Sequence, residues 1–190
     1  MLEALNQLVI RTSRSAWRFV GVTAMAAIAI TTLNRIGAAF PAAAAGAAPF
    51  DLQNRLTAAE VVQQLAGYTE LARWMYYVFT LIDYVFPFAA GLSLAAAGAF
   101  AMRHGFPAIY QAFERRGLFP LFLIGTGFDW CENIAAISAI WVYPGDVSTV
   151  ATLLVIAKRL KLACVVLTQL AVLLLLIGAV VRAIGRRAGR

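Results

Sequence analysis

The stretch Trp74–Met102, WMYYVFTLIDYVFPFAAGLSLAAAGAFAM, decides the fold class of this 190-residue chain. At 1.5 Å per residue it can cross a bilayer core of about 30 Å, and Asp83 is the single charged residue in the stretch. The whole chain is 62% hydrophobic and 13% charged, whereas soluble domains average about 45–50% apolar and about 25% charged residues. We therefore expect an all-α, polytopic membrane protein that forms a single domain over residues 1–190.

Three further apolar runs are long enough to be transmembrane helices. Together with the first stretch they predict a four-transmembrane-helix bundle. The four predicted spans cover residues 16–33, 74–102, 118–142 and 162–181.

The connections between these spans also carry signals. The first outer loop, residues 34–73, contains an alanine-rich run at 41–48 that we interpret as flexible. A short amphipathic helix should follow from Ala58, because Thr57 and Glu60 have the spacing of a capping box. After the turn at Pro144-Gly145, residues 148–184 can form one long helix that includes the last span.

Basic residues predict the orientation. Ten Lys and Arg residues lie in the amino-terminal segment, the loop 103–116 and the carboxy-terminal tail, against six in the two opposite loops. This asymmetry places both termini on the cytoplasmic side of a bacterial inner membrane. The net charge of +7 then reflects topology and membrane lipids as partners, and we expect no nucleic acid. A homo-oligomer or a larger membrane complex stays open.

The third predicted span carries most of the candidate site. Thr126, Asp129 and Asn133 follow an i, i+3, i+7 pattern and share one helical face, with Glu132 at its edge. Charged groups in hydrocarbon cost about 2.5–3.5 kcal/mol each on insertion scales, so a chain that keeps several should use them. Small residues on the opposite face, from Gly127 and Cys131 onward, favour close helix packing.

The second predicted span brings a matching set of polar residues. Counting inward at 1.5 Å per residue, Asp83 and Asn133 both lie about 15 Å below the outer surface. Because the two helices are antiparallel, Asp83, Glu132 and Asn133 can share one layer, and we expect at least one carboxylate to retain a proton. The residues on this side of the second span are Tyr76, Thr80, Asp83 and Pro87.

These patterns give the predicted site. We do not assign a metal, since the chain has one histidine and a shared proton explains the acids more simply than a divalent cation. The sequence leaves the cofactor unknown. Lys161 is the nearest counter-charge, although we favour an interfacial collar for Lys158, Arg159 and Lys161. The catalytic candidates are Asp83, Asp129 and Glu132, and the binding candidates are Asn133, Thr126, Tyr76, Thr80 and Lys161.

The acidic motifs carry two resemblances. Asp129-Trp130-Cys131-Glu132-Asn133 is similar to the D-W-C-E-x-N stretch of alkaline ceramidases, seven-helix zinc enzymes. This chain lacks a residue before Asn133, has too few spans and has one histidine where zinc needs three, so we infer no ceramidase activity. The order Phe50-Asp51-Leu52, D-Y-x-F-P from Asp83, D-x-x-E-N from Asp129 and then a lysine resembles a group of uncharacterised bacterial four-helix integral membrane proteins. That resemblance implies the span count and no activity.

Three functions are compatible with the sequence. An intramembrane site that binds or modifies a lipid or isoprenoid by proton transfer is our first hypothesis, since carboxylates in apolar surroundings suit acid–base work. The second is a non-catalytic subunit or assembly factor of a membrane complex, with small-residue stripes as partner surfaces. The third is a component of proton- or cation-coupled transport. The sequence leaves open whether the protein is an enzyme.

Overall fold

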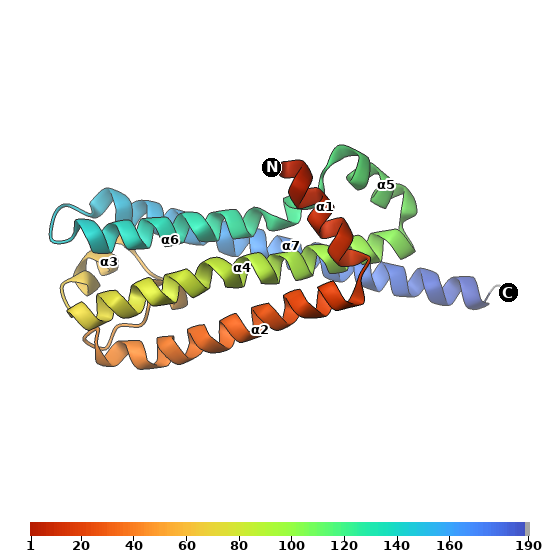
Figure 1. The fold of residues 1–190 in the computed structure, drawn as a ribbon. Coiled ribbons are helices and arrows are strands. Elements are labelled where there is room, and N and C mark those ends of the chain that lie inside the picture. The colour runs from red at the N-terminus through yellow and green to blue at the C-terminus, as the bar shows by residue number, and fades with distance from the viewer. Residues whose placement is uncertain (189–190) are drawn as a thin grey trace. The chain divides into compact units, whose positions relative to one another are not determined.

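The computed structural model describes residues 1–188, with side chains as far as Arg186, and all regular elements in this range are helical (Figure 1). The prediction of an all-helical chain is therefore confirmed. Arg190, which counts toward the predicted charge asymmetry, lies outside the described residues. The helices are α1 (Leu2–Ser13), α2 (Ala16–Ala39), η1 (Phe40–Ala42), η2 (Phe50–Leu52), α3 (Ala58–Leu65), α4 (Glu70–Gly105), α5 (Pro107–Arg116), η3 (Phe119–Leu123), α6 (Ile124–Val142) and α7 (Ser148–Ala188), where η marks a 3₁₀ helix.

Three stretches of the described chain are helices long and apolar enough to cross a membrane, by length and composition. They are Ala16–Ala42, Glu70–Gly105 and Ser148–Arg186. α6 is not one of them, because polar side chains in its middle dilute its apolar sequence. The fourth span therefore stays a prediction.

The described residues form two compact parts, and each is considered by itself. The terminal part contains residues 1–25, 88–125 and those from 163 onward. The central part contains residues 26–87 and 126–162. All the predicted site residues belong to the central part.

The terminal part contains two helices, α1 and α5, where the sequence indicated only connecting segments. α5 replaces most of the loop expected over 103–116, because Pro107 fits a first helical turn and Gly117, at φ +64°, ends it. The buried Asn6 joins these segments: its amide donates to Glu114 O at 3.5 Å, and its Oδ1 accepts from Phe119 N at 3.3 Å. Apolar side chains around Val9 and Phe119 complete the core.

The central part is closed by the segment before α4. Phe40 of η1 and Phe50 of η2 each contact the rings of Tyr68 and Tyr76. The ring centroids in these four pairs are 5.3 to 5.9 Å apart. Ala43 and Ala44 are buried beside them, whereas Ala45 and Gly46 are exposed, so the flexibility expected of the alanine-rich run stays a prediction.

α3 begins at the capping box that the sequence indicates. The hydroxyl of Thr57 accepts from Glu60 N at 3.3 Å, and the Glu60 carboxylate accepts from Thr57 N at 2.7 Å. Hydrogen bonds from Thr57 lower the pKa of Glu60 below its ordinary value. Val61 and Leu65 are the buried residues of this helix. Its place in an outer loop remains a prediction.

Close helix contact occurs at a glycine other than the predicted one. A Cβ on Gly127 would have no atom within 4 Å, and Cys131 is exposed. These two residues therefore do not make the close helix contact that was expected of them. In the terminal part, a Cβ on Gly105 would lie 2.7 Å from both Cα and Cβ of Ala179. α4 and α7 therefore approach closely at Gly105, where there is no room for a side chain.

Gly105→Ala should destabilise the protein by about 1–3 kcal/mol, because the new methyl meets backbone of α7 that cannot rotate away. Gly21→Ala is the matched control, since it adds the same methyl to a helix with no atom within 4 Å. Thermal unfolding in detergent measures both. Equal melting temperatures for the two variants would contradict the close contact.

Candidate functional site

α4 and α6 are held side by side in the central part by hydrogen bonds from α6 side chains. Residue numbers rise along α6 as they fall along α4, so the two helices are antiparallel. Two of these bonds end on backbone carbonyls of α4, those of Tyr84 and Pro87, and the third ends on the side chain of Asp83. The pairs are Thr126 Oγ1 to Pro87 O at 2.9 Å, Trp130 Nε1 to Tyr84 O at 3.1 Å and Asn133 Nδ2 to Asp83 Oδ2 at 3.0 Å.

Two lysines of α7 neutralise the acids of α6. Lys158 Nζ lies 2.6 Å from Glu132 Oε1, and Lys161 Nζ lies 2.6 Å from Glu132 Oε2 and 2.7 Å from Asp129 Oδ1. The side chains of Lys158 and Glu132 are 2% and 0% exposed. The interfacial collar that we favoured is therefore wrong for both lysines, although Arg159 is exposed as expected.

Asp51 is a further acid at this site, and it was not among the predicted site residues. The aromatic rings seat η2 so that Asp51 Oδ2 accepts from Tyr76 OH at 2.9 Å, and its Oδ1 lies 3.6 Å from Lys161 Nζ. Its backbone carbonyl accepts from Lys158 Nζ at 3.2 Å. We call Asp51, Asp83, Asp129, Glu132, Lys158 and Lys161 the carboxylate–lysine cluster.

The ammonium group of Lys161 lies against three carboxylates that could otherwise hold a metal ion. Oxygens of Asp51, Asp129 and Glu132 all lie within 4.8 Å of one another, a spacing that could hold a metal ion. Lys161 Nζ contacts all three carboxylates. An external cation at this place would have to displace the lysine.

Asp83 has no such cation partner. It is 5% exposed, and among the described residues its side chain accepts a hydrogen bond from Asn133 Nδ2 alone, which also donates to Asp129 Oδ2 at 3.4 Å. Asn133 Oδ1 is buried and has no hydrogen-bond partner among the described residues. A protonated carboxyl group beside it could donate to this oxygen. The remaining predicted residue, Thr80, donates its hydroxyl to Tyr76 O at 2.9 Å.

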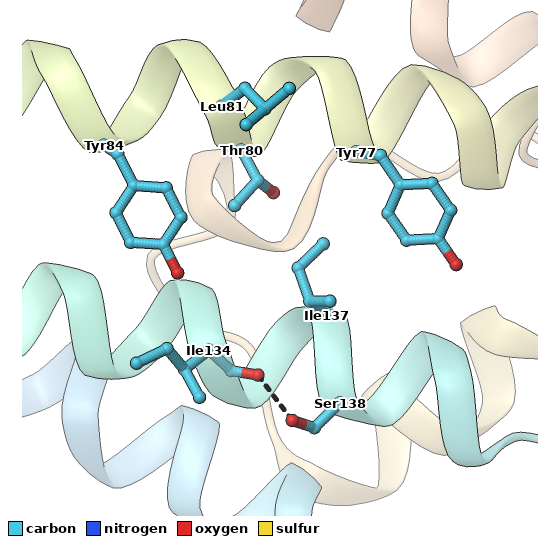
Figure 2. Close-up of a pocket in the computed structure, with 7 residues that line it drawn as sticks. All are labelled: Tyr77, Thr80, Leu81, Tyr84, Ile134, Ile137 and Ser138. Atoms are coloured by element: carbon cyan, nitrogen blue, oxygen red, sulfur yellow. Dashed lines mark hydrogen bonds between the residues drawn. The ribbon is translucent and has the colours of Figure 1, made fainter.

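A groove of about 400 Å³ lies between α4 and α6 beside this cluster. Figure 2 shows the rings of Tyr77 and Tyr84 extending from α4 toward the side of α6 that bears Ile134 and Ile137. The other lining residues are Thr80, Leu81 and Ser138, whose hydroxyl donates to Ile134 O at 2.7 Å. Thr80 is the one predicted site residue in the lining, and no carboxylate takes part in it.

Comparisons with protein-family models, curated proteins and solved structures gave no match to this chain. The resemblance to bacterial four-helix membrane proteins stays a prediction.

Glu132→Gln should destabilise the protein by about 3–5 kcal/mol, because it leaves Lys158 buried without an anion. Asp83→Asn makes the same chemical change and should cost about 1 kcal/mol or less, since the new amide oxygen can still accept from Asn133. Thermal unfolding followed by tryptophan fluorescence compares them. A loss for Asp83→Asn as large as that for Glu132→Gln would show that Asp83 is ionised and paired.

Lys161→Ala should make stability depend on a divalent cation, because it leaves three clustered carboxylates without their ammonium group. Calcium at about 100 times its Kd would restore about 2.7 kcal/mol. Lys158→Ala is the control, since Lys158 pairs with one of the three carboxylates only. Melting curves with calcium and with a chelator test this, and identical curves for Lys161→Ala would contradict it.

Proposed function

We propose that this chain is an integral membrane protein of a bacterial inner membrane that binds a lipid or isoprenoid chain in the α4/α6 groove. In this proposal α6 is the fourth span and both termini are cytoplasmic. The three membrane-length helices support the membrane location. The groove beside the buried cluster is the observation that carries the proposal.

The lining of the groove suits a long apolar molecule that carries an oxygen function. Leu81 and Ile134 are 69% and 58% exposed, so in a bilayer the groove borders lipid. Its volume of about 400 Å³ is in the range of small-molecule sites, about 300–1,000 Å³. Tyr77, Tyr84 and Thr80 place hydroxyl groups along the apolar wall, where they can orient a polar end of the ligand.

Asp83 is the acid best placed for proton transfer. It follows Thr80 by one helical turn, and no lysine in the described part of the chain forms an ion pair with it. A carboxylate held by a lysine is committed to that pair, whereas Asp83 can gain or release a proton without leaving a buried cation unpaired. We therefore assign proton exchange to Asp83, and assign the positioning of α6 and α7 to Asp129 and Glu132.

Ser138→Trp should remove the bound lipid, because an indole on the wall fills much of the groove. Leu153→Trp adds the same side chain at an exposed position of α7 and is the control. Native mass spectrometry of protein purified from membranes in mild detergent measures the lipid retained. Equal lipid occupancy in both variants and the parent protein would refute the groove as the binding site.

The same preparation tests proton transfer. In D2O, Asp83→Asn should retain the lipid without placing carbon-bound deuterium in it, whereas lipid held by the parent protein should gain mass as Asp83 exchanges a carbon-bound hydrogen for solvent deuterium. If the parent protein and Asp83→Asn both return the lipid unaltered, the protein binds without catalysis.

A second candidate function is a non-catalytic subunit or assembly factor. The ion pairs of Lys158 and Lys161 favour it, because they tie η2, α6 and α7 together without contact to the groove. In such a protein the ion pairs would keep a partner-binding surface rigid. A stable partner that still co-purifies with Ser138→Trp would support this function over lipid binding.

A further inference from the structure

We propose that a pocket in the terminal part binds the phosphate-bearing headgroup of an anionic phospholipid. The pocket has a volume of about 510 Å³ and is formed by the junction of α1 and α2, the last turns of α4, and α7. It shares no residue with the groove, and it rests on the proposed membrane location but not on lipid binding in the groove. We call it the arginine pocket; its lining includes Arg14, Ser15, Phe19, Ala97, Phe100 and Arg103.

The arginine pocket is basic at one wall and apolar at another. Arg14 and Arg103 bring two guanidinium groups, and no acidic side chain takes part in the lining. Phe19, Ala97 and Leu176 supply the apolar wall. An amphiphile with a negative head and a hydrocarbon tail matches both walls.

Arg103 is the residue most available to such a headgroup. Its Nη2 donates to Ser13 O at 3.4 Å and lies 3.4 Å from His104 Nε2, and it has no acidic partner among the described residues. Its guanidinium also lies 5.8 Å from the Phe100 ring centroid. These neutral contacts hold the side chain in place without cancelling its charge.

Arg14 is fixed in a different way. Its Nη2 donates to Glu114 Oε1 at 2.8 Å and to Tyr110 OH at 3.1 Å. One nitrogen makes both bonds, so the other guanidinium donors remain free for a phosphate. Contact with the Tyr110 hydroxyl raises the pKa of Arg14, which keeps its charge.

The start of α2 adds further donors. Ser15 precedes Ala16, the first residue of α2, and both line the pocket. The first backbone amides of a helix lack intrahelical acceptors and bind phosphate readily. The hydroxyls of Thr12 and Ser13 are already bonded to Leu8 O and Ile10 O, and Ser15 Oγ already accepts from Arg18 N at 3.4 Å. The donors left for a phosphate are therefore the guanidinium groups and the first two amides of α2.

A phospholipid fits better than a soluble phosphate ester. α2 begins at the pocket and belongs to a stretch long and apolar enough to cross a membrane, so a headgroup here would carry its tail along the apolar wall. Basic pockets between transmembrane helices bind anionic lipid headgroups. Affinity from charge and affinity from apolar contact should therefore be separable by experiment.

Native mass spectrometry with phosphatidylglycerol and phosphatidylcholine of the same chains tests the proposal on the full protein. Phosphatidylglycerol should bind at least about tenfold more tightly, and Arg103→Gln should weaken it by about tenfold, the scale of one charge-assisted hydrogen bond. Arg116→Gln removes the same charge from an exposed position of α5 and should leave binding unchanged. Ala97→Phe fills the apolar wall with both arginines intact and should also weaken binding.

Equal binding of the two lipids overturns the proposal, as does a loss in Arg116→Gln equal to that in Arg103→Gln. If Arg103→Gln does not fold, undiminished binding to Ala97→Phe overturns it. Soluble glycerol phosphate should fail to displace phosphatidylglycerol at equal concentration. Displacement would overturn the lipid assignment in favour of a free phosphate ester.

Discussion

The ion pairs of Lys161 are the interaction on which the central part depends. This one ammonium group of α7 lies against carboxylates from η2 and α6, so it joins η2 to two helices that come much later in the sequence. Burial of such charges is costly, and close geometry with several partners is what offsets it. The aromatic rings around Phe50 serve the same end, because they hold Asp51 within reach of Lys161.

The cluster nevertheless holds more acid than base. Four carboxylates face two lysines, and Asp83 is the acid that neither lysine contacts. In surroundings of low dielectric the surplus must be met by bound protons or by an external cation. The unpartnered Asn133 Oδ1 favours protons, since a carboxyl hydroxyl is a donor that this oxygen lacks.

Hydrophobic length predicted the helices well, because long apolar runs admit few alternatives. α4 and α7 extend beyond the predicted spans but contain them, and the long helix from residue 148 was expected. α1 and α5 were not predicted, since neither is apolar enough to stand out. Their burial depends on contacts such as those of Asn6, which join residues more than a hundred positions apart.

The part of the site that was predicted is the part that helix geometry alone brings together. Helical periodicity brings Asp129 and Asn133 to one face, and antiparallel depth brings Asp83 beside them. Depth counting misled for Lys161, because a lysine side chain is long enough to reach acids below its own backbone position. A usable signal was present: Lys158 and Lys161 repeat the i, i+3 spacing of Asp129 and Glu132. Asp51 had no such signal, since its position depends on how the loop folds.

The difference between Glu132 and Asp83 separates structure from function in this cluster. Glu132 has a lysine on each oxygen, so a change in its protonation would strand a buried cation. Asp83 has only a neutral amide as partner and lies one turn from a groove that borders exposed apolar surface. A network of this kind can stay rigid through its lysine pairs while one carboxyl group changes protonation. Proton exchange with a bound molecule is therefore expected at Asp83, and rigidity at Glu132.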